Sequence, residues 1–520
     1  MAGIPFAVTE GQGTQGSVYF LNLGSVIDFR VYSTNYAGEQ IESITLAVTS
    51  GSHAVSGDAT INLTSVASGN ESSLSLTWPE GVASSVTLSQ AGTVATSKDA
   101  AAAAGSMLMV VAPGTYSGTI TIVTNVANYT FSFTDKTFTR NSIKGFNMNL
   151  DNAVRNKLYF RLENDKMAAY LDYMDEHPYD TTYTNSYVEQ YSNTKSSDNR
   201  LDLPLPVTLS WISTQTGTSA EVYYDSSHTQ PEPMAYVKFS SDANSVDIYN
   251  LIPNRHYYYV IKDDNNTVVA SGEFHTTGHR RIMYVAYPPY GKPYANNCRD
   301  LGGLKTTDGR TVKYGKIFRG TNLDSTTTNQ QKYIKQVMGV GLDVDLRVIK
   351  KPSPSDDGKA MFNALGLDTI VAGNSAKFVG HTQETYDNIG NLTNPSKMGP
   401  TLTRIMNAAI NEVGVYIHCT VGADRTGFVC PMLEAILGVK QGLCDVDYEL
   451  TSFSPALLSS SKFFRLRNDT SVDWLYYPRG ITAINKRSST TFLERAIDYA
   501  VNVLGVPADK ITAFQNCMLE

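Results

Sequence analysis

The chain has 520 residues, of which 42% are hydrophobic and 18% charged, a composition that is typical of folded domains and excludes an intrinsically disordered chain. Such a length is enough for about three domains. The 42 Lys and Arg residues against 49 Asp and Glu residues give a net charge of −7, which argues against nucleic acid or a broad anionic membrane surface as the main partner.

Residues 1–155 are predicted to form a β-sandwich. Apolar and polar side chains alternate in Ser43–Val48, Thr119–Val123 and Asn128–Phe133, which is typical of half-buried strands. Three segments resemble the fimbrillin-like modules of bacterial surface proteins, namely Ile44–Leu46, Val55–Gly57 and Val111–Tyr116. This resemblance implies a spacer, adhesion or surface-display role.

Residues 156–200 are predicted to be a polar, Tyr-rich linker. Within it, Met167–Glu176 is expected to be helical, because a helix can end ahead of His177-Pro178. Ser192–Asn199 has the composition of an exposed connection.

Residues 201–278 are predicted to form a second β-sandwich. Pro206–Trp211 and Leu251–Val260 contain strand patterns, and Asp263–Asn266 has the composition of a hairpin turn. The spacing Leu251-x-Pro253-x-x-x-Tyr257 resembles the tyrosine corner of immunoglobulin-like sandwiches. The unit resembles a fibronectin type III domain, which implies either a binding platform or a rigid adaptor.

Residues 279–520 are predicted to form an α/β domain, because strand and helix patterns alternate there. We expect strands at Gly341–Leu346 and Val415–His418, and helices at Gly399–Val413 and Arg425–Leu437. This order indicates a mostly parallel central sheet. Sheets of this kind carry their functional sites at the carboxyl ends of the strands.

One motif lies at such a strand end. It reads His418-Cys419-Thr420-Val421-Gly422-Ala423-Asp424-Arg425-Thr426-Gly427. A loop that precedes a helix can turn its backbone N–H groups inward and bind a phosphate. Gly422 lacks the Cβ that would obstruct this curl, and the Arg425 guanidinium can pair with two phosphate oxygens. The predicted phosphate-binding residues are Thr420, Val421, Gly422, Ala423 and Arg425.

Cys419 is the predicted nucleophile. The loop amides and the helix dipole can lower the pKa of such a thiol from about 8.5 into the range of about 3.5–7.5. The thiolate can then attack phosphorus and form a cysteinyl-phosphate that water hydrolyses. Thr426 is expected to hydrogen-bond the sulfur and His418 to order the loop. No metal or other cofactor is required, because Arg425 and the amides balance the transition-state charge.

The motif resembles the active-site loop of the protein-tyrosine phosphatase superfamily, in particular the bacterial tyrosine phosphatases with an H-C-x-x-G-x-D-R-T-G loop. Four further segments resemble the family in the expected order, namely Asn297–Gly303, Lys313–Gly320, Val344–Arg347 and Asp447–Thr451. Many relatives carry Lys at the position of Ala423, and that Lys accompanies activity on phosphoinositides. Its absence favours phosphotyrosine as the substrate.

The resemblance also suggests a general acid, because the loop Asp is the candidate in the bacterial subfamily. That residue is Asp424, which could also act only as a cap on the helix. An upstream Asp or Glu, for example Asp356, Asp357, Asp368 or Asp387, or water, is the alternative. Five polar residues at strand ends are expected to form a buried ion-pair network that braces the loop, namely Arg299, Asp300, Arg319, Asp345 and Arg347.

The leading hypothesis is a cysteine-dependent phosphatase that acts on phosphotyrosine in a protein or on a small phosphate ester. An inositol-phosphate or phosphoinositide phosphatase built on the same loop is one alternative. A surface adhesin whose last domain binds phosphate without turnover is another. Nucleic acid is not expected as a partner.

The five widely spaced cysteines include no C-x-x-C pair, which argues against a zinc site of paired cysteines and against a dense disulfide scaffold. No apolar run reaches the ~18 residues that span a bilayer, and Met1–Pro5 does not resemble the start of a signal peptide. The 31 tyrosines and the low charge favour an extracytoplasmic location, whether secreted, periplasmic or at the bacterial cell surface through the N-terminal β domains.

Overall fold

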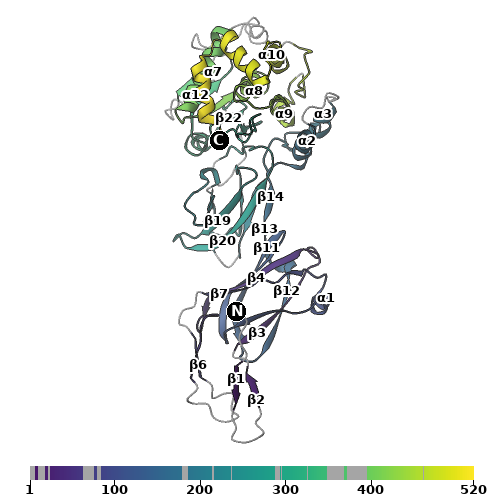
Figure 1. The fold of residues 1–520 in the computed structure, drawn as a ribbon, viewed down its shortest axis with the longest axis vertical. Coiled ribbons are helices and arrows are strands. Elements are labelled where there is room, and N and C mark those ends of the chain that lie inside the picture. The colour runs from purple at the N-terminus through teal and green to yellow at the C-terminus, as the bar shows by residue number, and fades with distance from the viewer. Residues whose placement is uncertain are drawn as a thin grey trace. The chain divides into compact units, whose positions relative to one another are not determined.

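The computed structural model describes residues 6–9, 18–21, 24–62, 75–78, 84–177, 186–212, 216–235, 237–286, 293, 295–324, 326–347, 368–371, 395–460, 462–472 and 474–520. The chain divides into two compact units (Figure 1). The first comprises Met1–Tyr159, Thr208–Thr216 and Asp242–Val246, and the second comprises Phe160–Val207, Gly217–Ser241 and Asp247–Glu520. Within the described residues, no helix is long and apolar enough to cross a membrane.

The first unit is rich in β-structure. Its main strands are β3 (Ser25–Tyr32), β4 (Gln40–Gly51), β7 (Ser84–Leu88), β8 (Gly92–Thr93), β9 (Met107–Val111), β10 (Gly114–Thr124), β11 (Ala127–Phe138), β12 (Ile143–Asn149) and β13 (Val154–Lys157). One sheet has the order β13-β11-β10-β4-β7, with β8 paired to β4, and a smaller sheet has the order β12-β3-β9. Along β10 every second side chain is buried, so one face of the larger sheet covers the core. The predicted strands at Ser43–Val48, Thr119–Val123 and Asn128–Phe133 are confirmed.

The next part of the chain carries a second set of strands, namely β14 (Tyr159–Arg161), β15 (Val207–Ser210), β16 (Ser219–Tyr223), β17 (Val237–Lys238), β18 (Ser245–Ile248), β19 (His256–Lys262) and β20 (Val268–Thr277). Five of them form a sheet with the order β14-β20-β19-β16-β17. Tyr257 is fully buried, and its hydroxyl accepts the backbone N–H of Ile252 at 2.9 Å. This is the contact of a tyrosine corner, at the spacing that the sequence predicts.

The segment predicted to be a linker, residues 156–200, differs from that prediction. It supplies β14 to the second sheet, the expected helix as α2 (Asp165–Glu176), and a further helix, α3 (Ser186–Ser192). Ser192 and Lys195, predicted to be exposed, are buried. Phe160–Val207 belongs to the same compact unit as the α/β region. The polar composition of the segment did not indicate this burial, because a few apolar residues on one face are enough to bury a helix against the rest of the unit.

These apolar residues form a cluster with the α/β region. Met167, Tyr170 and Leu171 of α2 pack in one buried cluster with Val446 and with Leu450, Phe453 and Leu466 farther along the chain. The Tyr170 hydroxyl also donates a hydrogen bond to the buried Glu449 carboxylate at 2.6 Å. The helical segment is therefore part of the folded α/β unit.

The α/β region contains a five-stranded sheet of β21 (Arg299–Asp300), β22 (Ile317–Gly320), β23 (Val340–Asp345), β24 (Asp368–Val371) and β25 (Gly414–His418). Its order is β21-β22-β25-β23-β24. The pairs β22–β25, β25–β23 and β23–β24 are parallel, and β21 is antiparallel to β22. The helical elements are α4 (Thr328–Lys332), η4 (Tyr333–Val337), α7 (Pro395–Ile410), α8 (Thr426–Ile436), α9 (Gln441–Leu450), η5 (Thr451–Phe453), η6 (Pro455–Leu457), α10 (Tyr476–Asn485), α11 (Phe492–Asp498), η7 (Tyr499–Val503) and α12 (Ala508–Met518).

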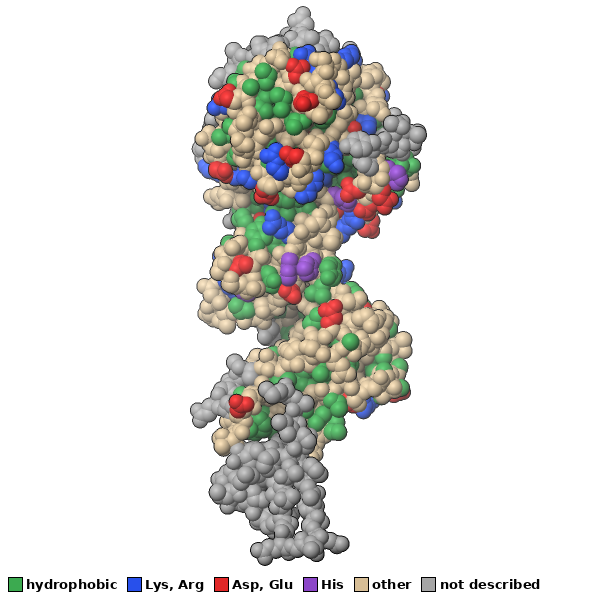
Figure 2. Space-filling view, viewed as in Figure 1, with side chains coloured by type: hydrophobic (Ala, Val, Ile, Leu, Met, Phe, Trp, Pro, Cys, Tyr) green, Lys and Arg blue, Asp and Glu red, His purple; other side chains and the backbone are tan. Residues whose placement is uncertain are grey.

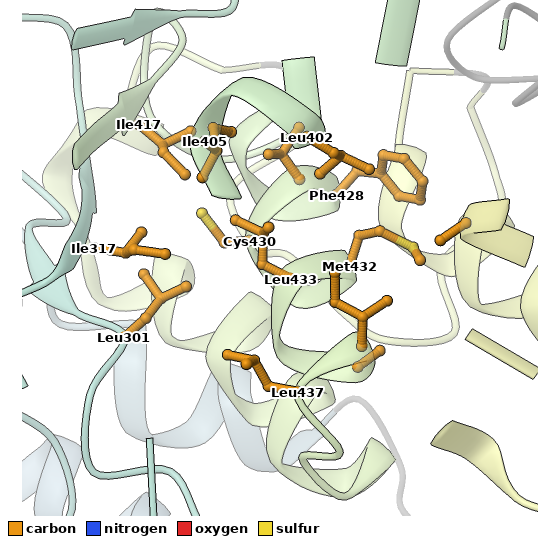
Figure 3. Packing of buried hydrophobic residues seen from close by; sticks show 14 of the residues in the cluster. Leu301, Ile317, Leu402, Ile405, Ile417, Phe428, Cys430, Met432, Leu433 and Leu437 are labelled. Atoms are coloured by element: carbon orange, nitrogen blue, oxygen red, sulfur yellow. The ribbon is translucent and has the colours of Figure 1, made fainter. Parts of the chain in front are cut away.

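Helix α8 runs through the centre of this region, and each of its residues is buried. Figure 3 shows Phe428, Met432 and Leu433 of this helix among apolar side chains from the sheet and from α7. Cys430 lies in the same cluster and is fully buried, as expected of a small core residue. Because β25 and α8 are both buried, they hold in place the two ends of the loop that joins them.

We expect Leu171→Ala to lower the free energy of unfolding by about 2–5 kcal/mol, because the substitution leaves a cavity in the cluster shared by α2 and α9. Amide hydrogen exchange in α9 should become faster, and urea denaturation should measure the loss of stability. The control is Leu108→Ala, since Leu108 is 46% exposed and surface substitutions usually change stability by less than about 0.5 kcal/mol. Unchanged exchange in α9 would mean that α2 is a dispensable linker.

Candidate active site

The candidate site lies at the carboxyl end of β25, where a short loop leads into α8. The structure brings the predicted residues together in one continuous turn, namely His418, Cys419, Thr420, Val421, Gly422, Ala423, Asp424, Arg425 and Thr426. Cys419 is 2% exposed and Arg425 is 8% exposed. Access to the sulfur is therefore narrow.

Groups from outside the loop bind its carbonyl oxygens. The Thr420 carbonyl accepts the backbone N–H and the side-chain amide of Asn322 at 3.2 and 2.8 Å. The Gly422 carbonyl accepts Nδ2 of Asn297 at 3.0 Å and Nη2 of Arg319 at 2.8 Å. In a trans peptide the next N–H points to the side opposite the carbonyl. The amides that follow these carbonyls therefore face the inside of the turn, as an anion-binding loop requires.

Gly422 has a positive φ of +66°, and a Cβ added there would lie 2.3 Å from the carbonyl oxygen of Gly320. Such a contact is with backbone and cannot be relieved by a side-chain rotation. The loop thus needs glycine at this position for two reasons, the backbone conformation and the close approach of β22.

A buried ion-pair network holds the residues that bind these carbonyls. Asp447 on α9 pairs with Arg299, with Nε and Oδ1 at 2.6 Å, and with the Nη1 group of Arg319. Arg299 also donates to the side-chain oxygen of Asn297. The prediction that Arg299 and Arg319 brace the loop is confirmed, and Asp447 and Asn297 complete the network.

The other residues predicted for this network also have buried partners. Asp300 accepts the backbone N–H groups of Gly302 and Gly315 at 2.8 and 2.7 Å. Asp345 is bound by Arg347, with Oδ2 and Nη2 at 2.7 Å. Asp300 therefore acts on nearby backbone, whereas Asp345 also lies 3.8 Å from Nδ1 of His418.

The Cys419 thiol is set for ionisation. Burial raises its pKa, but the Arg425 guanidinium and the hydroxyl and amide of Thr426 outweigh burial, so its pKa is lowered overall. Three other cysteines in this region have raised pKa values, because they are buried without such compensation, namely Cys298, Cys430 and Cys444. Among these four cysteines, Cys419 is therefore the one whose surroundings favour the thiolate.

His418 is buried directly before the nucleophile. Burial lowers its pKa, but the carboxylates of Asp343 and Asp345 more than offset this and raise the pKa to about 9. Its Nε2 lies 3.1 Å from Oδ1 of Asp343, and its Nδ1 lies 3.0 Å from the Cys419 carbonyl oxygen. Through these two contacts the ring links the start of the loop to β23.

Arg425 is the last residue of the loop before α8. Its Nη1 donates a hydrogen bond to the Leu346 carbonyl at 3.1 Å. That carbonyl follows β23, the strand next to β25 in the sheet. The guanidinium is thus oriented from a neighbouring strand end, which leaves less side-chain entropy to lose when an anion binds.

Asp424 forms a bidentate ion pair that the sequence did not indicate. Nε and Nη2 of Arg465 donate to its two carboxylate oxygens at 2.6 and 3.1 Å. Arg465 is 1% exposed, and its Nη1 donates to the carbonyl of Lys462 at 2.8 Å. Arg465 lies outside any helix or strand and is far from the loop in the sequence, so no spacing or motif could have indicated this ion pair.

The segment around Arg465 is itself held by the helical segment at residues 160–207. Lys195 Nζ donates to the carbonyls of Ser452 and Phe463 at 2.6 and 2.7 Å. The Ser452 hydroxyl in turn accepts the Arg465 N–H at 2.8 Å. Burial, together with the charge of Arg465, lowers the pKa of Lys195 to about 8. A chain of contacts thus connects the predicted linker to Asp424.

The alternative acids Asp356, Asp357 and Asp387 lie outside the described residues, and Asp368 is the first residue of β24. The residues that the structure describes contain no group of three His, Cys, Asp or Glu side chains that could hold a metal ion.

Comparisons with known proteins agree with this location of the site. Residues 293–520 match the model of the tyrosine phosphatase family. The chain is 27% identical over 160 residues to a Cupriavidus necator protein named "Putative tyrosine-protein phosphatase", and the match covers 28% of this chain and 56% of that protein. The chain therefore spans about half the length of this curated relative. The C-terminal region, where the sequence predicts the catalytic domain, is thus the part of the chain that is similar to the tyrosine phosphatase family.

Two solved structures are similar to part of the chain. The core catalytic domain of the PP-IP phosphatase SIW14 from S. cerevisiae, in complex with citrate, is 14% identical, with a TM-score of 0.18, and 27% of this chain and 72% of that chain are covered. A second structure, of the Siw14 catalytic core, is 12% identical, with a TM-score of 0.20 and coverage of 36% and 89%. Scores this low support no conclusion about fold or substrate.

We expect Gly422→Ala to reduce kcat/KM for p-nitrophenyl phosphate on the order of 100-fold, because the added Cβ displaces the loop from β22 and a shift of about 1 Å has that effect. Gly309→Ala is the matched control, since Gly309 also has a positive φ, of +91°, but has no atom within 4 Å of the added Cβ. Steady-state kinetics measure both. An equal loss in the two variants would show that only backbone strain is at work.

We expect Arg465→Lys to lower kcat about tenfold or more for esters with poor leaving groups and much less for good ones. Lysine keeps the charge but cannot orient both oxygens of Asp424. Arg467→Lys is the control, because Arg467 binds the buried Glu449 with Nε and Nη2 in the same manner. Both variants should lose stability in urea, and equal kinetic effects in the two would contradict a positioning role for Arg465.

Proposed function

We propose that this domain hydrolyses phosphate monoesters through a cysteinyl-phosphate on Cys419, with phosphotyrosine as the preferred substrate. The observation that carries the proposal is the lowered pKa of the Cys419 thiol inside a turn whose amides face inward and whose helix begins beside Arg425. The family match over residues 293–520 supports the same chemistry.

The reaction would have two steps. In the first, the Cys419 thiolate attacks phosphorus, the bond from phosphorus to the ester oxygen breaks, and that oxygen leaves with a proton from a general acid. In the second, water attacks phosphorus, the sulfur–phosphorus bond breaks, and the proton released by water returns to the acid. The loop amides and Arg425 hold the charged equatorial oxygens in both steps.

We assign the general acid to Asp424. Its side chain is 16% exposed and adjoins Arg425, and Arg465 sets its direction before substrate arrives. Asp424 would take up a proton from solvent when the anionic substrate binds beside it, and would pass this proton to the leaving oxygen. A well-positioned acid of this kind contributes about 10²–10⁴-fold to the rate. In this proposal Arg465 is a positioning residue, because it acts through Asp424.

The preference for phosphotyrosine is supported by Ala423, which is fully buried and adds no cation to the loop. A multiply phosphorylated inositol ring would be favoured by an additional positive charge near the bound phosphate. The curated relative carries the name of a tyrosine-protein phosphatase. An inositol-phosphate substrate is the alternative outcome of the experiment below.

We also propose that the protein works outside the cytoplasm, at the bacterial surface or in secreted or periplasmic form. The low charge, the 31 tyrosines and the β-rich first unit support this location. The β-rich parts would then display the phosphatase or space it from a surface.

The test is a substrate panel with the purified full chain in EDTA and reductant, with a phosphotyrosine peptide, a phosphoserine peptide and an inositol polyphosphate. We expect the phosphotyrosine peptide to have the highest kcat/KM and Cys419→Ser to lower turnover on the order of 10⁴-fold or more. Cys517→Ser is the control, because Cys517 is the partly exposed cysteine and lies on α12.

Quenching during turnover should trap phosphate on the wild-type protein and none on Cys419→Ser. A higher kcat/KM for the inositol polyphosphate would reassign the substrate and keep the mechanism. Full activity of Cys419→Ser, or no turnover of any substrate, would remove the proposed chemistry.

A further inference from the structure

The helical segment at residues 160–207 precedes the part of the chain that matches the phosphatase family, residues 293–520. Figure 2 shows acidic side chains gathered over α2, whose exposed face is polar. Three ionisable residues of the segment are nevertheless buried, namely Glu163, Lys195 and Asp202. A charge can be buried only where other groups bind it, so the partners of these side chains indicate what the segment does.

Asp202 contacts the residue that supports the active-site loop, Asn297. Its Oδ2 accepts the backbone N–H of Asn297 at 2.7 Å, and its Oδ1 accepts Nε of Arg200 at 2.7 Å. Asn297 has a positive φ of +53°, a backbone conformation that is uncommon for residues other than glycine. The buried carboxylate therefore stabilises an unfavourable backbone conformation at Asn297.

From that conformation the Asn297 side chain reaches the loop. Its Nδ2 donates to the Gly422 carbonyl at 3.0 Å and to the Thr451 hydroxyl at 3.3 Å. The N–H of Ala423 belongs to the same peptide group as the Gly422 carbonyl and points the opposite way, into the turn. Asp202 thus acts, through Asn297, on one of the amides that would bind the phosphate.

Lys195 acts on the other end of the loop. Its Nζ donates to the carbonyls of Ser452 and Phe463 at 2.6 and 2.7 Å. The Ser452 hydroxyl accepts the Arg465 N–H at 2.8 Å and donates to the Arg465 carbonyl at 3.1 Å. Lys195 therefore fixes the backbone from which Arg465 binds both carboxylate oxygens of Asp424.

We infer that this helical segment contributes to catalysis, with Asp202 and Lys195 as positioning residues. Asp202 sets an amide that binds the phosphate, and Lys195 sets the carboxyl that protonates the leaving oxygen. The inference rests on the proposed function to different degrees. The role of Asp202 requires only that the loop binds a phosphate group, whereas the role of Lys195 requires that Asp424 is the acid.

The role of Asp202 is tested by isothermal titration calorimetry of the full chain with phenylphosphonate, which is not hydrolysed. We expect Asp202→Asn to weaken binding about tenfold, because an amide cannot bind both Arg200 and the Asn297 N–H as the carboxylate does. Glu163→Gln is the matched control. Glu163 is a buried carboxylate of the same segment, but it accepts the backbone N–H of Arg280, at 2.8 Å, and should leave the affinity unchanged.

The role of Lys195 is tested by steady-state kinetics with p-nitrophenyl phosphate, which has a good leaving group, and phenyl phosphate, which has a poor one. We expect Lys195→Met to lower kcat about tenfold for phenyl phosphate and much less for p-nitrophenyl phosphate, because the poor leaving group depends more on a proton. Its affinity for phenylphosphonate should equal that of the wild type. Asp202→Asn should instead lower kcat/KM for both esters by the same factor.

Equal affinities of Asp202→Asn and Glu163→Gln for phenylphosphonate would overturn the role of Asp202. Equal losses of Lys195→Met on the two esters would overturn the role of Lys195, and neither result would affect the proposed hydrolysis by the wild type. A merely structural segment would lower stability in urea in all three variants without separating binding from leaving-group dependence.

Two milder variants replace any that fails to fold. Arg200→Gln removes the partner that orients Asp202, and Ser452→Ala removes the hydroxyl that joins Lys195 to Arg465. A wild-type protein without turnover would remove the proposed function together with the role of Lys195, whereas the phenylphosphonate affinities would still decide the role of Asp202. Absence of phenylphosphonate binding to the wild type would overturn that role as well.

Discussion

The active site depends on where the carbonyl oxygens of one turn point. A loop that points several backbone N–H groups at an anion must point the preceding carbonyl oxygens away from it, into the protein. Each of these buried carbonyl oxygens then needs a hydrogen-bond donor. Asn322, Asn297 and Arg319 supply these donors to Thr420 and Gly422. Without them the buried carbonyls would be unsatisfied, and the turn would have no reason to keep its amides inward.

The donors are in turn held by charge. Asp447 binds Arg299 and Arg319 at once, and both arginines are buried. A pair of this kind contributes little net stability compared with apolar residues, but removing one partner is costly because the other remains buried and charged. The network therefore fixes geometry more than it stabilises the fold. It connects α9 to the loop through Asp447 and Arg319.

A similar chain of contacts connects the loop to the helical segment at residues 160–207. Lys195 holds the carbonyls of Ser452 and Phe463, and Ser452 holds the backbone of Arg465, which orients Asp424. The α/β domain is thus larger than the family match over residues 293–520.

The sequence by itself determined the strand, the turn and the helix around Cys419, because their residues are adjacent and each local preference agrees with the next. It also identified Arg299 and Arg319 as structural supports, since charged residues in buried strands need partners. Only the tertiary structure decided that Arg465 binds Asp424 and that Lys195 lies in the same unit. Each of these joins residues far apart in the chain, where no periodicity or spacing links them, and their contacts exist only once the buried surfaces have packed.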